Sequence, residues 1–213
     1  MKKKIGNWFY YYKWYLAAVV IITAVLVRWA GNILGIFEKK ADLQAAYIGR
    51  QPLSAETVQI LEDGLASYAG DYNHDGTVKV SVHVYLSAGE DSTTEAQQSA
   101  AAAEIALAGD INDCESYIFL MEDPAAVQLD WQILAEADGS CPKPTDYTVE
   151  NKVVPLSDLT LDLSGVTAEG DLLALGRLQV GRRCFYTDRT CRYPEDLDAF
   201  WKALTAAAGL KHQ

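Results

Sequence analysis

The strongest constraint on this chain is an apolar run close to its N-terminus. From Trp14 to Phe37 the sequence contains 24 residues, and Arg28 is the only charged one. As a helix with a rise of 1.5 Å per residue, this run is roughly 36 Å long, which is enough to cross a hydrocarbon core of about 30 Å. The run therefore predicts a transmembrane helix over residues 14–37, between a short N-terminus at 1–13 and a larger domain at 41–213.

The flanks of the run predict its orientation. Lys2, Lys3, Lys4 and the aromatic segment WFYYYKWY lie at its N-terminal side. An excess of basic residues is typical of the cytoplasmic side of such helices, and aromatic residues are enriched at the membrane interfaces. A cleaved signal peptide is the alternative, but no small-x-small cleavage site follows Val27. We expect an uncleaved signal anchor in the cell membrane, with a cytoplasmic N-terminus, a single pass and an extracellular domain.

The larger domain is strongly acidic. Residues 1–40 hold 7 of the 18 basic residues and 1 of the 29 acidic ones, so 11 basic and 28 acidic residues remain and the net charge of residues 41–213 is -17. A surface of this charge repels nucleic acid. Nucleic acid is therefore excluded as a partner, whereas cations and basic partners are compatible with the domain.

All four cysteines, Cys114, Cys141, Cys184 and Cys191, fall within residues 41–213. Four cysteines allow three pairings, and a zinc site would favour C-x-x-C pairs, which the sequence does not contain. Disulfides are expected in an oxidising compartment and thiols in a reducing one. The expected order of strands and helices favours the disulfides Cys114–Cys141 and Cys184–Cys191.

The first half of the domain alternates between strand and helix patterns. Strands are predicted at 42–49, 77–86 and 117–121, and helices are predicted to begin after Ser54, at the capping box of Ser92 and Glu95, and at Asp123 followed by Pro124. Right-handed crossovers between parallel strands then give a sheet covered on both faces. The sequence predicts an α/β fold, one three-layer domain with a mainly parallel sheet of order 2-1-3 plus additional strands.

The second half is less regular. Residues 139–171 contain one alternating run, Leu159, Leu161 and Leu163, and the segment LLALGRLQVGRRCFY at 172–186 predicts one or two further strands. A terminal helix is predicted to begin at Pro194 and to bury Leu197, Phe200, Trp201 and Leu204 at helical spacing.

The loop DYNHDG matches the opening of a calcium loop, which takes oxygen ligands at its positions 1, 3, 5 and 7. These ligands would be Asp71, Asn73, Asp75 and the carbonyl group of Thr77. Position 12, which supplies a bidentate carboxylate in an EF-hand, is Val82. A calcium site would therefore need a distant acid, namely Asp110, Asp113 or Glu62. The alternative is a turn in which Asp and Asn side chains bond the backbone and Gly76 takes a positive φ.

No motif identifies catalysis. The sequence contains no G-x-S-x-G, P-loop or G-x-G-x-x-G pattern, and His74, His83 and His212 are not spaced as a ligand pair. A ligand of an open α/β sheet binds beyond the carboxyl ends of the strands. The candidate ligand-binding residues at those ends are Arg50, Ser54, Glu90, Asp91, Glu122 and Asp123. Helix capping and solvated loops are the alternative explanation for them.

One segment resembles a known family. The residues AAAAEIALAGDINDCESYIFLMEDPAAV, together with the strand DLQAAYIG, are similar to one lobe of type-2 extracellular solute-binding proteins over residues 42–135. The chain differs in having no lipobox cysteine and no second lobe. It also resembles single-anchor membrane proteins of Firmicutes that begin with tyrosine-rich segments such as WFYYYKWY, which implies a location and not a chemistry.

These observations predict a membrane-anchored extracellular binding or interaction module of the cell envelope. Its partner would be a small ligand or another envelope protein. The alternatives are a structural or assembly partner of another membrane protein, and an exported enzyme of unrecognised type. Calcium is the one cofactor that the sequence suggests.

Overall fold

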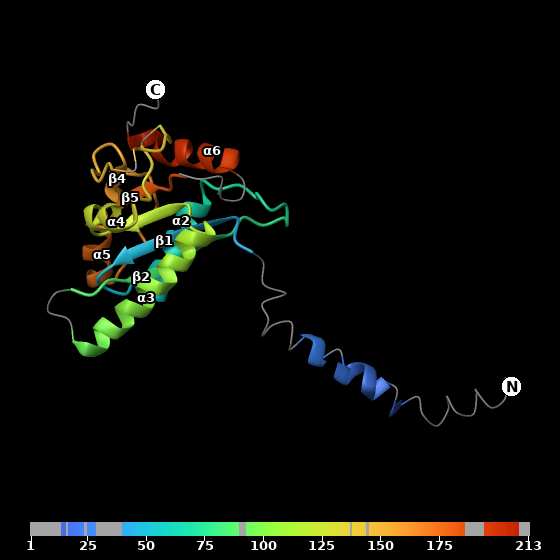
Figure 1. Ribbon diagram of the computed structural model, residues 1–213. Helices are drawn as coiled ribbons and strands as arrows, with labels where there is room; N and C mark the ends of the chain where they lie inside the picture. The colour runs from blue at the N-terminus through green and yellow to red at the C-terminus, as the bar shows by residue number, and fades with distance from the viewer. Residues whose placement is uncertain are drawn as a thin grey trace, which may run out of the picture. The chain divides into compact units, whose positions relative to one another are not determined.

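A computed structural model describes residues 14–15, 17–23, 25–28, 40–89, 93–136, 138–143, 145–185 and 194–208. The chain divides into two compact units, Met1–Lys40 and Ala41–Gln213. The second unit contains the sheet (Figure 1).

The transmembrane helix predicted over residues 14–37 is wrong. Within the described ranges, no helix is long enough and apolar enough to cross a membrane. The predicted extracellular location of residues 41–213 is not tested by the structure and stays a prediction.

The second unit is built around one five-stranded sheet with the order β2-β1-β3-β5-β4. Its strands are β1 (Leu43–Gly49), β2 (Val80–Leu86), β3 (Ile118–Met121), β4 (Val153–Pro155) and β5 (Gln179–Arg182). Strand β1 pairs in parallel with both β2 and β3, as the predicted order 2-1-3 requires. Strand β5 is antiparallel to β3 and to β4, so the sheet is mixed and not of the simple parallel type.

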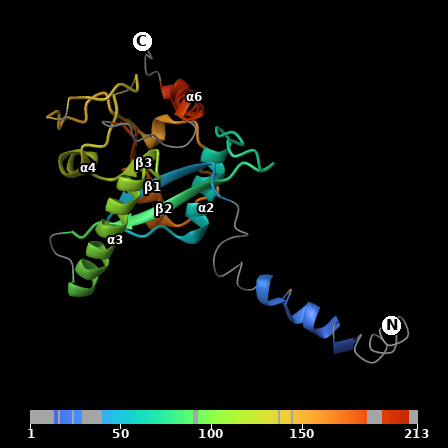
Figure 2. The ribbon, with the colours of Figure 1, turned by 45° about the vertical axis from the view of Figure 1, so that its right-hand side comes forward.

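Helices cover both faces of this sheet, and Figure 2 shows α2 and α3 on opposite sides of β1 and β2. On one face, α2 (Ala55–Ala66), α5 (Glu169–Leu175) and α6 (Pro194–Thr205) pack against Leu43, Ala45 and Tyr47 of β1. On the other face, α3 (Thr94–Asp113) and α4 (Pro124–Trp131) pack against Ala46 and Ile48. Because successive side chains of a strand point to opposite faces, β1 contributes to both cores. Two 3-10 turns, η1 (Leu156–Asp158) and η2 (Ala206–Ala208), complete the unit.

Side-chain caps begin three of the helices. The hydroxyl oxygen of Ser54 accepts from the Thr57 N–H, and the Asp123 carboxylate accepts from the Ala126 N–H. Both residues were predicted as N-caps. At α3 the cap is Thr93, whose hydroxyl oxygen accepts from the Ala96 N–H. Ser92, the predicted cap of α3, lies outside the described residues.

The segment 172–186, predicted to hold one or two further strands, contains the strand β5. The run Leu159, Leu161 and Leu163 forms no strand, and the residues that pair with β5 are Val153–Pro155. Among the described residues of the segment 172–186, Leu172–Leu175 belong to α5 and Gln179–Arg182 form β5. A short apolar run does not distinguish a buried strand from a buried helix by periodicity alone. Glu169 and Asp171 occupy the first turn of α5, where acidic side chains favour a helix.

The predicted disulfide between Cys114 and Cys141 is also wrong. Cys114, Cys141 and Cys184 form no disulfide in the described part of the chain. The Cys141 sulfur lies beside Phe185, whose N–H donates to it at 3.0 Å and whose carbonyl oxygen accepts from it at 3.1 Å. Cys114 is the residue that caps the C-terminal end of α3, and its sulfur lies 3.9 Å from the Ile111 carbonyl oxygen. Cys191, the other half of the predicted Cys184 pair, lies outside the described residues, and Cys184 is a buried thiol.

Candidate functional site

A cavity of about 390 Å³ opens at the carboxyl ends of the three parallel strands. It lies on the face of the sheet that α3 and α4 cover, with α3 forming one wall and α4 the other. At this position the chain leaves two neighbouring strands for opposite faces of the sheet, since β1 leads into α2 on one face and β3 leads into α4 on the other. Ligands of open α/β sheets bind at this kind of switch point.

The strand ends form the base of the cavity. β1 contributes Ile48 and the following Arg50, and β3 is followed by Glu122 and Asp123. From β2 come Tyr85 and Leu86, with Ser87 and Ala88 after them. The base therefore combines apolar side chains with charged ones.

The two helices line the cavity through residues at helical spacing. On α3 these residues are Gln97, Ala100, Ala101, Ala103, Glu104 and Leu107, and on α4 they are Ala126, Val127, Asp130 and Trp131. Residues three and four apart share one face of a helix. Because three of these six residues of α3 are alanines, their side chains leave space that larger ones would fill.

Charge in the cavity is predominantly negative. The lining contains four carboxylates, Glu104, Glu122, Asp123 and Asp130, against the single guanidinium group of Arg50. No ion pair involving any of these five residues occurs within the described part of the chain. The carboxylates are therefore not neutralised by a described cation of the protein itself.

Glu122 is held in place by hydrogen bonds. Its Oε2 accepts from the backbone N–H of Arg50 at 3.2 Å. Its Oε1 lies 3.4 Å from the hydroxyl group of Tyr47, which shares its one proton between Glu122 and the Gln51 carbonyl oxygen at 2.9 Å. Burial raises the pKa of Tyr47, and the nearby Glu122 carboxylate raises it further. Tyr47 therefore remains a neutral donor to Glu122 around neutral pH.

Beneath the base, Tyr85 connects the cavity to a buried polar network. Its hydroxyl group donates to Asp110 Oδ2 at 2.8 Å. The same oxygen accepts from the hydroxyl group of Ser116 and from the amide group of Gln44, and Arg183 lies 3.9 Å from Oδ1. Burial raises the pKa of Tyr85, as does its bond to Asp110. This network fixes α3 to the strands.

Half of the predicted ligand-binding residues meet at this cavity. Arg50, Glu122 and Asp123 line it. Ser54 does not, because its hydroxyl group donates to Asp171 at 2.6 Å on the other face of the sheet. Glu90 and Asp91 lie outside the described residues.

Several lining residues were not predicted, most clearly Glu104, Asp130 and Trp131. The signal for them was present in the spacing of α4. Asp123, Val127 and Trp131 follow one another at intervals of four residues, which places them on one face. The same spacing is typical of a buried stripe, but Trp131 is only half-buried.

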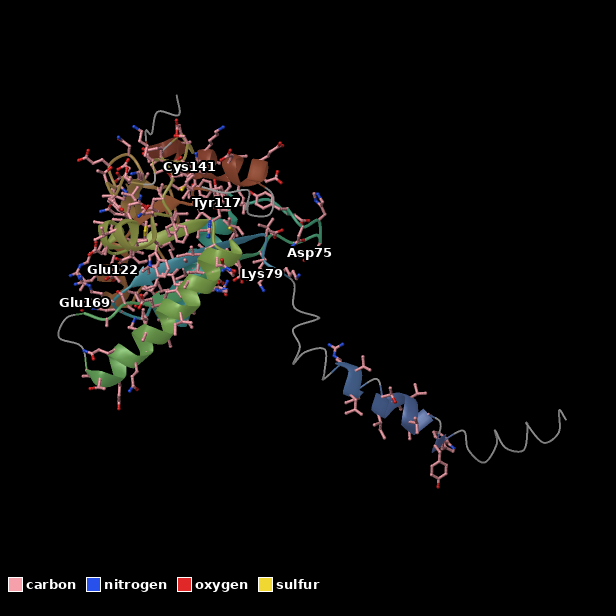
Figure 3. All side chains as sticks on the ribbon, viewed as in Figure 1. Asp75, Lys79, Tyr117, Glu122, Cys141 and Glu169 are labelled. Atoms are coloured by element: carbon pink, nitrogen blue, oxygen red, sulfur yellow. The ribbon has the colours of Figure 1, made fainter. Side chains whose placement is uncertain are left out.

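The predicted calcium loop lies at the opposite end of the sheet, and Figure 3 shows Asp75 and Glu122 far apart. Asp71 accepts from the N–H groups of Asp75 and Gly76 at 3.0 and 2.8 Å, and Asn73 Oδ1 accepts from that of Asp75 at 2.9 Å. Asp75 in turn accepts from the N–H and hydroxyl groups of Thr77. Gly76 has a φ of 84°. These hydrogen bonds are the ones expected of a turn, which is the alternative to a calcium site at this loop.

The acids that could have completed a calcium site are engaged elsewhere. Glu62 accepts from the Val82 N–H at 2.9 Å, Asp110 belongs to the buried network, and Asp113 accepts from Asn112. Among the residues described, no group of three or more His, Cys, Asp or Glu side chains could hold a metal ion. Binding of calcium through Asp71, Asn73, Asp75 and the Thr77 carbonyl group stays a prediction.

The described lining of the cavity contains no histidine, lysine or cysteine. Its carboxylates and the hydroxyl groups of Ser87 and Tyr85 are the side chains that could take part in acid–base or nucleophilic chemistry. Comparison with known proteins adds no assignment: no protein-family model, no curated protein and no solved structure matches this chain.

Proposed function

We propose that residues 41–213 form a binding module that holds a small molecule in the cavity between α3 and α4. The observation that carries this proposal is the cavity itself, about 390 Å³ at the carboxyl ends of β1, β2 and β3. Small-molecule sites commonly have volumes of about 300 to 1,000 Å³ and combine apolar walls with a few polar groups. The base and walls described above have this composition.

A binding role accounts for the residues better than an enzyme does. Carboxylates and one arginine are the charged groups of the described lining. A general acid and base would need a pair of groups whose environments separate their pKa values. A ligand site needs only fixed polar groups and an accessible space, and Glu122 is fixed by Tyr47 and by the backbone of Arg50.

The test is to fill the cavity without disturbing the fold. Ala101 and Ala102 are adjacent exposed residues of α3, and only Ala101 lines the cavity. Ala101→Trp should block the site, whereas Ala102→Trp adds the same side chain outside it. The melting temperature of the full-length protein and of both variants is measured with a panel of amines, amino acids, carboxylates, sugars and nucleosides.

We expect at least one class of solute to raise the melting temperature of the unmodified protein and of Ala102→Trp, but not that of Ala101→Trp. Ligands that bind only the folded state stabilise it by mass action. The proposal fails if every stabilising solute acts equally on both variants, or if no solute stabilises the protein.

A further inference from the structure

We infer that the ligand of this cavity is a small organic cation, an ammonium group carried on a short apolar chain. This inference rests on the proposed function, because it specifies the chemistry of a molecule in the same cavity. Its basis is the distribution of charge and apolar surface around that space.

The first argument is the charge of the lining. Glu104 of α3, Glu122 after β3, and Asp123 and Asp130 of α4 approach the cavity from three elements. Arg50 is the one cation of the described lining, which leaves a net charge of -3. A cavity lined by one sign of charge concentrates ligands of the opposite sign. An anionic ligand would be repelled by this negative charge.

The second argument is what surrounds the charges. Leu107 and Val127 are buried on the facing helices, and the ring of Tyr85 is buried between them and the sheet. This surface suits an alkyl or aryl group. Trp131 completes the wall of α4, and the face of a tryptophan ring also attracts cations. The cavity therefore offers an apolar interior beside acidic side chains.

The third argument concerns which acids are available to a ligand. Glu122 and Asp123 already accept backbone N–H groups, from Arg50 and Ala126. Glu104 and Asp130 are exposed, and the structure gives them no hydrogen bond or ion pair within its described residues. An ammonium group could pair with Glu104 and Asp130 without displacing a described hydrogen bond or ion pair of the protein.

Three probes of equal chain length separate charge from shape: n-hexylamine, hexanoate and 1-hexanol. Their binding to the full-length protein is measured by titration calorimetry at neutral pH, where the amine is a cation and the acid an anion. We expect hexylammonium to bind at least tenfold more tightly than hexanoate. We also expect raising the salt from about 0.01 M to about 0.15 M to weaken its binding, because the screening length falls from roughly 30 Å to 8 Å.

Charge-removing variants locate the interaction. Glu104→Gln and Asp130→Asn should each weaken hexylammonium binding by about threefold, and the double variant by about tenfold, since exposed ion pairs contribute modestly. Glu56→Gln is the matched control, because Glu56 is an exposed acid on α2, at the opposite face of the sheet. It should leave the affinity unchanged.

The outcomes separate this inference from the proposed function. Binding of hexanoate or hexanol as tight as that of hexylammonium, and abolished by Ala101→Trp, overturns the cationic ligand while the cavity remains a binding site. Absence of hexylammonium binding overturns the inference as well. If no solute of the wider panel binds to the protein, both the cationic ligand and the proposed binding function are overturned.

Discussion

Tyr85 and Asp110 join the base of the cavity to the end of α3, through a hydrogen bond of 2.8 Å from the tyrosine hydroxyl group to Asp110 Oδ2. Both side chains are buried. Asp110 also accepts from the N–H and hydroxyl groups of Ser116, at 2.7 and 2.5 Å. One carboxylate thus connects β2, α3 and the residues before β3, and β2 and α3 line the cavity.

Tyr85→Phe should destabilise the protein while keeping the ring in place. The substitution removes one bond to a buried carboxylate, and hydrogen bonds to charged groups contribute about 1.5 to 3 kcal/mol. We expect the free energy of unfolding in urea to fall by about 1 to 3 kcal/mol. Tyr147→Phe, at an exposed position, is the control and should change it by less than about 0.5 kcal/mol. Equal effects of the two substitutions would contradict the role of the network.

Asp171 should make stability sensitive to acid. Its Oδ2 accepts from the hydroxyl groups of Ser54 and Thr57, both at 2.6 Å. These bonds hold the pKa of Asp171 below its usual range, with the Ser54 bond the largest cause. A carboxyl group with a lowered pKa in the folded state stabilises the protein above its unfolded pKa of about 3.9, and this contribution is lost as the pH falls through the folded value.

Asp171→Asn should therefore be less stable than the unmodified protein at pH 7, by about 1 to 3 kcal/mol. The difference should shrink as the pH falls from about 5 to about 2, because the aspartate then becomes protonated. Urea unfolding across this pH range measures it. A difference that stays constant with pH would show that the carboxylate charge is not what Ser54 and Thr57 recognise.

Sequence patterns predicted the first half of the domain well for physical reasons. β1, β2 and β3 carry regular apolar patterns, and Asp123 followed by Pro124 is a local signal for the start of α4. β4 is only three residues long, so it contains too few side chains for an alternating pattern. Its position depends on pairing with β5, a contact between distant segments that local patterns do not encode.

The candidate site was predicted only where strands end. Arg50, Glu122 and Asp123 follow β1 and β3 directly, so the rule for open sheets identified them. Glu104 and Asp130 come from helices, and their approach to the cavity depends on how α3 and α4 pack on the sheet. Ser54 follows the same rule as Arg50, but its bond to Asp171 places it on the other face. Helix packing was the missing information in each case.

Lys152 is a buried cation, and replacing it tests how much its charge and how much the volume of its side chain contribute to stability. Its side chain is 0% exposed, and its ammonium group lies 3.1 Å from Asp146 Oδ2 and 3.7 Å from Glu136 Oε1. It also donates to the Thr148 carbonyl oxygen at 2.7 Å. Asp146 has a pKa lowered to about 2, first by its bond to Thr148 and also by Lys152.

Lys152→Ala removes both the charge and the packed stem, so we expect a loss of about 2 to 5 kcal/mol in the free energy of unfolding. Lys152→Met keeps much of the stem volume, and its loss should be smaller by about 1 kcal/mol or more. Both carboxylates are partly exposed, at 29% and 33%, and remain hydrated without the lysine. Urea unfolding of the two variants provides the comparison. Equal losses would show that packing of the stem contributes nothing.

Thiol accessibility tests the corrected state of the cysteines. Cys141 is exposed, Cys114 is half-buried and Cys184 is buried. Alkylation of the folded protein with iodoacetamide should therefore modify Cys141 first and Cys184 last, with all three modified after unfolding without a reductant. Peptide mass spectrometry over time gives the three rates. Resistance of Cys114 and Cys141 to alkylation in the unfolded, unreduced protein would restore the disulfide that the structure contradicts.

Asp42 should prove more important to the acidic loop than calcium. This buried acid reaches the loop from the residue before β1. Its Oδ1 accepts from the N–H groups of Tyr72 and Asn73 at 2.9 and 3.0 Å, and its Oδ2 accepts from that of Lys79 at 2.8 Å. The carboxylate therefore ties both ends of the loop to the sheet.

Asp42→Asn replaces one acceptor oxygen by an amide donor, which opposes the N–H groups it faces. We expect a loss of about 1 to 3 kcal/mol in the free energy of unfolding. Millimolar calcium should leave the melting temperature of the unmodified protein unchanged, because Asp71 and Asp75 already accept N–H groups of the loop. A saturable rise in melting temperature with calcium, abolished by Asp71→Asn, would instead establish a metal site. Since the Asp42 bonds are independent of any ion, the stability loss of Asp42→Asn should be the same in calcium and in chelator.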